Sequence, residues 1–174
     1  MFALNGKYQI SANFSPSEHI VVFPGDCIEL LREVPDETIQ LIVTSPPYNI
    51  GKEYETRLTL ENYLQQQKEV IQESARVLSP QGSLCWQVGN YVDNGAIIPL
   101  DTILYPLFTD LGLKMRNRII WHFEHGLHCS RRFSGRYETI VWFTKSNDYL
   151  FELDKVRVPQ KYFKSQSQLV VAQP

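Results

Sequence analysis

Short apolar runs alternate with amphipathic segments along most of the chain. The runs at 19–23 and 41–44 are rich in β-branched residues and end close to prolines, a pattern that predicts two short buried strands. Apolar residues recur at helical spacing after Asp26 and again from Leu60. Asp26 and Thr59 are typical N-cap residues at the starts of these two predicted helices.

The same alternation continues in the second half of the chain. Residues 79–82 form a predicted turn that leads into a predicted strand at 83–88. The helix predicted at 100–111 contains Pro106, which favours a kink, and it ends at Gly112. The order of strand, helix and strand is therefore repeated.

Two further strands are predicted at 117–122 and 138–144, joined by a loop too long for a tight hairpin. Strands that alternate with helices indicate an α/β layer with a parallel sheet, to which the last two strands add an antiparallel edge. Ligands bind at the carboxyl ends of the strands in such sheets. Asp26 and Ser45 both follow predicted strands, so the sequence predicts a site at this edge.

The composition is that of one globular domain. The chain has 174 residues, of which 43% are hydrophobic and 21% charged, values that exclude a disordered or collagen-like protein. A net charge of -2 leaves DNA binding to a local basic patch. Three widely spaced cysteines favour a reducing, cytoplasmic location. No apolar run approaches the roughly 20 residues needed to span a bilayer, so no membrane partner is expected.

The Ser-Pro-Pro-Tyr tetrapeptide at 45–48 carries the most specific chemistry. Its two prolines remove two N–H groups and fix two φ angles, so backbone carbonyls are presented as acceptors from a stiff corner. Such a corner suits an amino group held by acceptors while a flat ring stacks on Tyr48. A rigid turn with an aromatic plug is the alternative interpretation of this short motif.

The tetrapeptide and three flanking segments together resemble the amino-methylating DNA methyltransferases, which modify cytosine N4 or adenine N6 with S-adenosyl-L-methionine. The family signature is Ser/Asn/Asp-Pro-Pro-Tyr. The flanking matches are Phe-Pro-Gly-Asp-Cys at 23–27, Leu-Ser-Pro-Gln-Gly-Ser at 78–83 and Arg-Tyr-Glu-Thr-Ile-Val-Trp-Phe-Thr-Lys at 136–145. The resemblance implies a Rossmann-like α/β sheet, mostly parallel with an antiparallel late strand.

The resemblance covers only the catalytic half of that family. In the permuted subclass this half comes first, followed by a target-recognition region and a cofactor segment with a glycine-rich loop. The nine glycines of this chain include no Gly-x-Gly. We therefore expect an incomplete sheet, with an N-terminal extension at 1–19, the catalytic half at 20–155 and a tail at 156–174. A truncated recognition region is one interpretation of the tail.

The resemblance also implies roles for the corner. Ser45 Oγ and the Pro46 carbonyl would hold the target amino group by positioning and electrostatics, with Pro47 completing the catalytic corner. Tyr48 would pack on a base extruded from the duplex. No covalent intermediate is required.

Two residues are expected to contact S-adenosyl-L-methionine. Asp26 would hydrogen-bond the adenine or ribose edge of the cofactor, and Thr44 would lie beside it at the end of the strand. An N-cap is the alternative role of Asp26, supported by Glu29 three residues later. The two roles are compatible.

The predicted contacts with double-stranded DNA lie in two loops. They are Asn49, Arg131, Arg132 and Arg136. A solvated basic loop is the alternative for the arginines. The loosely spaced His122, His125, His128 and Cys129 do not form a metal-binding pattern, so no metal is expected.

The expected function is site-specific methylation of DNA within a restriction–modification system. Serine at the first motif position favours cytosine N4 over adenine N6 within the family. Three alternatives are open: an inactive or regulatory DNA-binding remnant, half of a split methyltransferase that needs a second chain, and another α/β nucleotide enzyme that uses Asp26.

Overall fold

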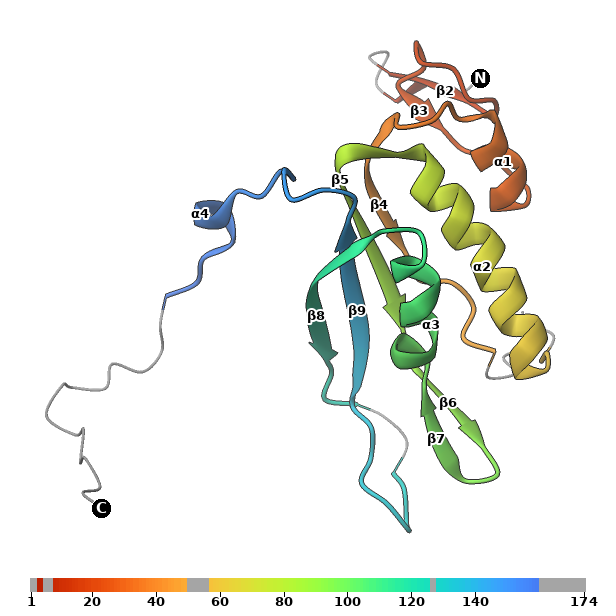
Figure 1. Ribbon diagram of the computed structural model, residues 1–174, viewed down its shortest axis with the longest axis vertical. Helices are drawn as coiled ribbons and strands as arrows, with labels where there is room; N and C mark the ends of the chain where they lie inside the picture. The colour runs from red at the N-terminus through yellow and green to blue at the C-terminus, as the bar shows by residue number, and fades with distance from the viewer. Residues whose placement is uncertain (1–2, 5–7, 50–56, 126–127, 160–174) are drawn as a thin grey trace, which may run out of the picture.

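A four-stranded sheet with helices on one of its faces forms the body of the protein in the computed structural model (Figure 1). The sheet has the order β4-β5-β9-β8, formed by Ile39–Thr44, Leu78–Val88, Tyr137–Thr144 and Lys114–His122 respectively. The structure describes residues 3–4, 8–49, 57–125 and 128–159.

One strand of this sheet is reversed relative to the other three. β4 and β5 are parallel, and β9 is antiparallel to both of its neighbours, so β4, β5 and β8 share one direction. Their carboxyl ends lie at the lower edge of the sheet in Figure 1. The expectation of a mostly parallel sheet with an antiparallel late strand is confirmed.

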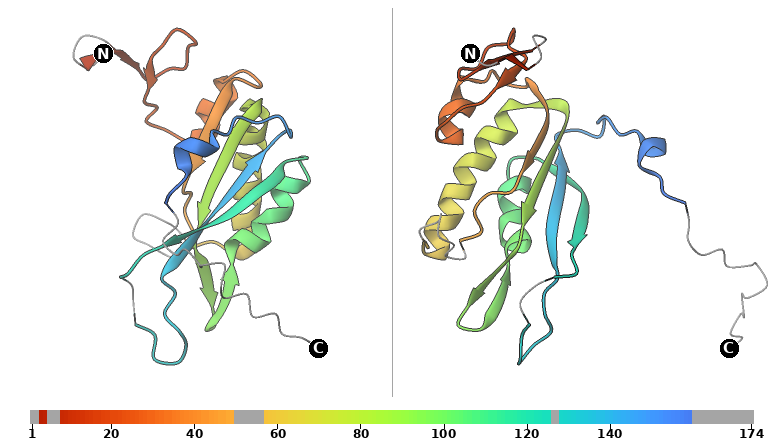
Figure 2. Two further views of the ribbon diagram at one scale, coloured as in Figure 1. Left: turned by 90° about the vertical axis from the view of Figure 1, so that its left-hand side faces the viewer. Right: turned by 180° about the vertical axis from the view of Figure 1, so that it is seen from behind.

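The core lies between the sheet and two helices, α2 (Leu60–Val77) and α3 (Leu100–Thr109), which cover the same face (Figure 2). The fully buried rings of Phe108 and Phe143 stack with their centroids 4.4 Å apart and join α3 to β9. Gly112 follows α3 with a φ of 78°, a conformation that glycine adopts without strain. Both helices therefore match the apolar spacing of the sequence.

The predicted helix starts are confirmed. In front of α1 (Cys27–Glu33), the Asp26 carboxylate accepts a hydrogen bond from the Ile28 N–H at 2.8 Å. The Thr59 hydroxyl accepts one from the Asn62 N–H at 3.3 Å at the start of α2. Each cap satisfies a donor that the first turn leaves unpaired.

The buried strand predicted at 19–23 is wrong. Only β3 (Ile20–Val21) forms there, and it pairs with β2 (Tyr8–Ser11), which pairs in turn with β1 (Ala3–Leu4). This small sheet lies above α1 in Figure 1 and is separate from the central sheet. An apolar run favours a strand but does not specify the partner with which it pairs.

The turn predicted at 79–82 is also wrong, because these residues lie within β5. The register passes from the pair Ile39–Leu78 directly to the pair Leu41–Ser83. β5 therefore has extra residues opposite β4, and they form a bulge. The Pro-Gln-Gly sequence that indicated a turn breaks the local ladder without ending the strand.

The buried strand predicted at 41–44 is present as β4, but it buries only one side. Ile42 packs against the core, whereas Leu41 and Val43 are 59% and 69% exposed. These side chains lie on the face of the sheet that α2 and α3 do not cover, which we call the outer face. By strand register the exposed side chains of Ile119 and Trp121 share this face. Within the described residues β4 is an edge strand.

The hairpin of β6 (Asn90–Asp93) and β7 (Ala96–Pro99) was not predicted. It projects from the lower end of the sheet (Figure 1). Asn94 and Gly95 connect the strands with φ values of 46° and 82°. Two positive φ angles are typical of a type I′ turn, for which Asn-Gly is the preferred sequence.

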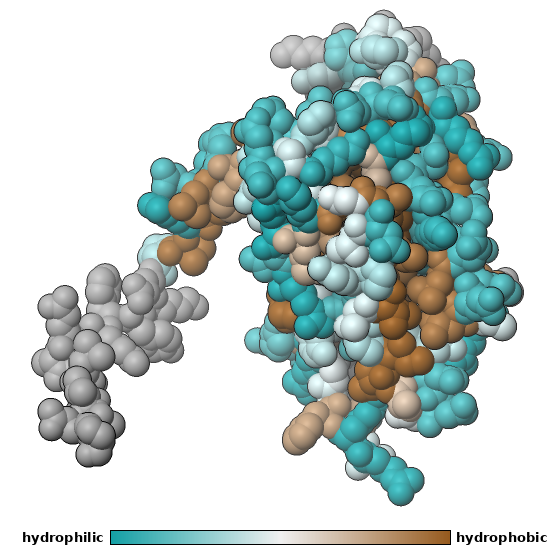
Figure 3. Space-filling model, viewed as in Figure 1, coloured by the Kyte–Doolittle hydropathy of each residue, from teal (hydrophilic) through white to brown (hydrophobic). Residues whose placement is uncertain are grey.

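After β9 the chain leaves the sheet and forms α4 (Leu153–Val156) (Figure 1). The exposed apolar residues of this segment are Leu150, Leu153, Val156 and Val158. Figure 3 shows hydrophobic surface in brown on this part of the molecule, at the left. No helix among the described residues is long and apolar enough to cross a membrane. Most of the predicted tail at 156–174 lies outside the described residues.

Candidate active site

The Ser-Pro-Pro-Tyr corner leaves the carboxyl end of β4 and joins a hydrogen-bond chain that spans the sheet. Ser45 Oγ lies 2.8 Å from the Tyr48 hydroxyl oxygen. The Tyr48 hydroxyl donates to Glu138 Oε2 at 3.1 Å, and Gln87 Nε2 donates to the same oxygen at 2.5 Å. The chain thus connects the corner after β4 with β5 and β9. Antiparallel pairing places the end of β5 beside the start of β9.

The Tyr48 ring is held against backbone next to the end of β5. A Cβ atom on Gly89 would lie 3.1 Å from Cδ2 of Tyr48, so the ring occupies the space that a side chain would need. Partial burial raises the pKa of the Tyr48 phenol, the Ser45 hydrogen bond opposes this, and the nearby Glu138 charge raises it further. Tyr48 therefore stays protonated at neutral pH.

A cleft of about 680 Å³ lies between this corner, the start of α1 and one side of α2. It brings together five of the residues that the sequence predicted for catalysis and cofactor binding: Asp26, Thr44, Ser45, Pro46 and Pro47. Pockets of a few hundred to about 1,000 Å³ accommodate ligands the size of a nucleoside derivative. Asp26 lines the cleft while it caps α1, so its two proposed roles coexist.

Gln67 of α2 is a cleft residue that the sequence analysis missed. Its side chain is buried, at 6% exposure, and Oε1 has no hydrogen-bond partner among the described residues. A buried acceptor without a partner is unfavourable by about 1–3 kcal/mol. A ligand with a donor group would satisfy Gln67, which makes the cleft suitable for a polar cofactor. A polar residue on the buried side of an amphipathic helix was the available signal.

Asn49, which the sequence predicted as a DNA contact, is buried beside the corner. Asn49 is 3% exposed, with a φ of 59°. Its Nδ2 donates to the Leu58 carbonyl at 2.9 Å, and its Oδ1 accepts from the Leu58 N–H at 2.6 Å. These two hydrogen bonds join Asn49 to Leu58, and Asn49 also lines the cleft; its contact with DNA stays a prediction.

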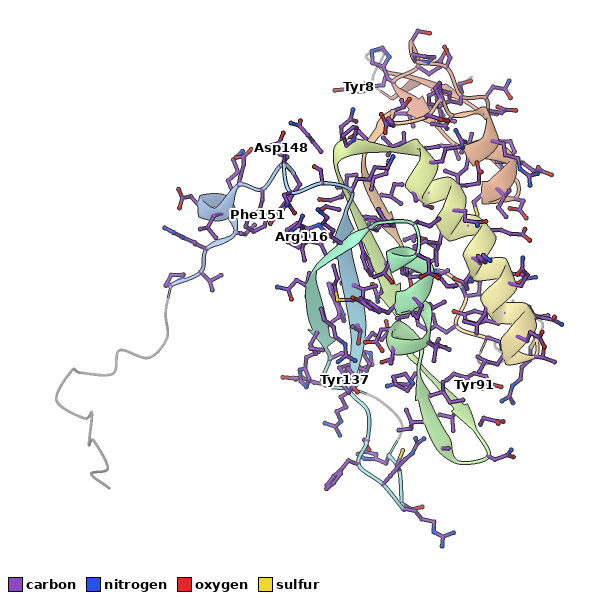
Figure 4. All side chains as sticks on the ribbon, in the orientation of Figure 1. Tyr8, Tyr91, Arg116, Tyr137, Asp148 and Phe151 are labelled. Carbon is purple, nitrogen blue, oxygen red and sulfur yellow. The ribbon has the colours of Figure 1, made fainter. Side chains whose placement is uncertain are left out.

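A second contact involves Arg57, the next described residue after Asn49. Arg57 donates to the Tyr91 hydroxyl at 2.9 Å and to the Val92 carbonyl at 3.2 Å. Tyr91 is labelled on the β6–β7 hairpin in Figure 4. Arg57 is therefore joined to the hairpin; residues 50–56 lie outside the described part.

The predicted arginines lie in the loop between β8 and β9. Arg131 and Arg132 are exposed and Arg136 is half-buried, and none of them forms an ion pair among the described residues. We call this segment, 128–136, the basic loop. Phe133, next to Arg132, is 99% exposed. The loop projects from the same end of the sheet as the corner (Figure 1).

The described residues contain no group of three or more His, Cys, Asp or Glu side chains arranged to hold a metal ion. Glu138, Gln87 and Gly89 were missed as site residues, although Glu138 lies in a segment that carried the family resemblance. Polar residues within otherwise apolar strands were the signal. Only the strand register shows that they meet the corner.

Two curated DNA methyltransferases are similar to this chain in sequence. The chain is 52% identical over 149 residues to the type II methyltransferase M.BglII of Bacillus subtilis, covering 84% of this chain and 41% of that protein. It is 30% identical over 150 residues to the DNA adenine methyltransferase YhdJ of Escherichia coli, covering 83% of this chain and 48% of that protein. The chain thus spans less than half of either relative.

A solved structure extends the likeness to the fold. A Thermus thermophilus protein described as a DNA modification methylase, determined in complex with S-adenosyl-L-methionine, superposes with a TM-score of 0.60 at 28% identity. The match covers 78% of this chain and 61% of that one. Residues 39–170 match the N6_N4_Mtase family, described as DNA methylase. The Rossmann-like expectation is confirmed, and the chain belongs to the N6/N4 DNA methylase family.

Proposed function

We propose that this chain is the catalytic half of a site-specific DNA methyltransferase that transfers a methyl group from S-adenosyl-L-methionine to an exocyclic amino group. One observation carries the proposal: the corner shares a single cleft with Asp26 and Thr44, the residues expected to bind the cofactor. The names of both relatives, and the cofactor complex of the Thermus protein, support it.

In this proposal the corner acts by positioning. An exocyclic amino nitrogen is a weak nucleophile because its lone pair is delocalised into the base. Ser45 Oγ and the Pro46 carbonyl accept its hydrogens, and Pro47 keeps the corner rigid. Tyr48 stacks on the base once it has left the duplex. The cofactor supplies an electrophilic methyl group.

Separate groups hold the two substrates. Asp26, Thr44 and Gln67, whose Oε1 has no partner among the described residues, line the cleft and would hold S-adenosyl-L-methionine. The arginines of the basic loop are free of protein carboxylates among the described residues and would contact phosphates of double-stranded DNA. Serine at position 45 favours cytosine N4 as the target, and the proposed context is restriction–modification.

We infer that a further segment, in the same polypeptide or in a second chain, completes the catalytic half at 20–155. The edge of β4 carries unpaired backbone groups and exposed apolar side chains within the described residues. The chain also has no Gly-x-Gly to approach the methionine end of a cofactor. The proposed role of 156–174 is to lead into a recognition region.

Complementation with labelled cofactor tests the proposal. The chain would be mixed with long unmethylated duplex DNA, alone and together with the part of M.BglII that it does not match. We expect weak cofactor binding and no methyl transfer by the isolated chain, and transfer by the completed enzyme. Tight calorimetric binding of S-adenosyl-L-methionine by the isolated chain would contradict the need for a second segment.

Ser45→Ala in the completed enzyme should slow single-turnover transfer by about 10²-fold with DNA affinity nearly unchanged, because a positioned acceptor is lost.

Mass spectrometry of the nucleosides should show N4-methylcytosine; N6-methyladenine would correct the target base. DNA binding without transfer in every combination would favour the regulatory remnant.

A further inference from the structure

Glu138 lies outside the Ser-Pro-Pro-Tyr motif, yet its carboxylate is bound to the motif. Oε2 accepts from the Tyr48 hydroxyl at 3.1 Å and from Gln87 Nε2 at 2.5 Å. Ser45 is the next member of the chain, 2.8 Å from the Tyr48 oxygen. The four side chains come from three strand ends, and their positions depend on the pairing of β5 with β9.

The protons that Glu138, Tyr48 and Ser45 carry decide which group donates in each hydrogen bond between them. An ionised carboxylate has only acceptors, whereas a phenol has one proton. Partial burial raises the pKa of Tyr48, so the phenol keeps that proton at neutral pH. The proton is directed to Glu138, and the short Ser45–Tyr48 contact then requires a donor from the other side. That donor is the Ser45 hydroxyl.

The direction of these hydrogen bonds decides whether Ser45 presents a donor or an acceptor to a substrate. Its single proton is directed to Tyr48, so Oγ keeps its lone pairs for a donor, and Ser45 is one of the residues that line the cleft. An exocyclic amino group carries two N–H donors and needs acceptors. A Ser45 hydroxyl with its proton turned outward would instead repel those donors.

We propose that Glu138 is a positioning residue: through Tyr48 it orients the Ser45 hydroxyl so that Oγ acts as an acceptor for the amino group of the target base. This role rests on the proposed function, since the acceptor has a use only for an amino substrate. Glu138 acts through two other side chains and does not touch the base itself.

Glu138→Gln tests the proposal with little change of shape. A carboxamide can donate to the Tyr48 oxygen, which releases the phenol proton toward Ser45 and reverses the chain. In the completed enzyme we expect kcat to fall at least tenfold, with KM for DNA changed less than twofold. Glu33→Gln, at an exposed position of α1, is the matched control and should retain the activity.

A double-mutant cycle separates orientation from structural support. Tyr48→Phe keeps the ring but removes the hydroxyl through which Glu138 acts. In that background Glu138→Gln should change kcat less than twofold, because the hydrogen bonds through the Tyr48 hydroxyl are already absent. Equal losses in both backgrounds would overturn the proposal, as would a Glu138→Gln enzyme as active as the wild type. If the wild-type completed enzyme transfers no methyl group, the proposed function fails instead.

A second measurement needs no activity. Carbon-13 labelled tyrosine allows the Tyr48 phenol to be titrated by NMR in the isolated chain. The Glu138 charge raises the Tyr48 pKa, so Glu138→Gln should lower it while Glu33→Gln leaves it unchanged. An unchanged Tyr48 pKa in Glu138→Gln would show that the phenol does not donate to Glu138 and would overturn the inference. Circular dichroism of each variant checks that it is folded.

Discussion

Tyr48 is held from two sides, by the hydrogen bonds of its hydroxyl and by the bare backbone at Gly89. The hydroxyl contacts Ser45 and Glu138, and the ring occupies the space where a Gly89 side chain would lie. A ring fixed in this way loses little conformational freedom when a base stacks on it. In the proposed function, the face on which the base would stack is therefore ordered in advance.

Gly89→Ala tests this arrangement at the scale of one atom. The new Cβ would lie 3.1 Å from Tyr48 Cδ2, closer than an ordinary contact, so the ring must shift. We expect a change in the Tyr48 NMR resonance and a fall of about tenfold or more in methyl transfer by the completed enzyme, the size of effect that misplacement of a positioning group produces. Gly135→Ala is the control for the resonance, because a Cβ there meets nothing within 4 Å. An unmoved Tyr48 resonance in Gly89→Ala would contradict the packing argument.

At the scale of elements, the segments at the carboxyl ends of the strands differ in whether their polar side chains have protein partners. The Asn49–Leu58 hydrogen bonds and the Arg57–Tyr91 hydrogen bond are structural contacts next to the corner. The basic loop instead leaves its arginines without ion pairs among the described residues. DNA contact is therefore expected first from the basic loop.

Arg131→Ala and Arg132→Ala should each weaken DNA binding and reduce its salt dependence. Each phosphate contact contributes about 0.9 to the slope of log K against log salt for duplex DNA, because it releases condensed counterions. Fluorescence anisotropy over a series of salt concentrations measures that slope. Arg157→Ala is a matched control, since Arg157 is exposed on the segment after β9 and pairs with Asp154. Slopes equal to this control would mean that the loop is only solvated.

At the scale of the whole molecule, one face of the sheet is covered by helices and the other displays apolar side chains. Leu41 and Val43 lie on the outer face of an edge strand. An exposed apolar edge of this kind pairs readily with other chains. The shape of the molecule is therefore consistent with the proposed need for a completing segment.

The isolated chain should self-associate through β4, and Val43→Lys should shift it toward monomer. A lysine on an edge strand opposes pairing with another chain, because its charge and hydration lie beside the joining strand. Sedimentation velocity at several concentrations gives the distribution of species. Val158→Lys changes another exposed valine, at 84% exposure, on the segment after β9 and should leave association unchanged. A wild-type chain that stays monomeric at all concentrations would refute this account.

Helices α1, α2 and α3 and the four strands of the central sheet were accessible from local pattern. Asp26 and Thr59 cap the helices that they were expected to cap, and the apolar spacing from Leu60 corresponds to α2. The β6–β7 hairpin was missed although its Asn94-Gly95 signal is local. Errors at 19–23 and 79–82 have a different origin, because the partner of a strand and the bulges within it depend on residues far along the chain.

The sequence by itself determined the chemistry of the corner, because two adjacent prolines after a strand restrict the backbone whatever surrounds them. Only the tertiary structure decided which side chains meet that corner. Tyr48 and Glu138 are 90 positions apart and are joined by the pairing of β5 with β9. The hydrogen bonds of Asn49 are a second example, since its partner Leu58 does not follow it at helical or strand spacing. Hydrogen-bond partners of this kind are set by long-range packing, which no local period encodes.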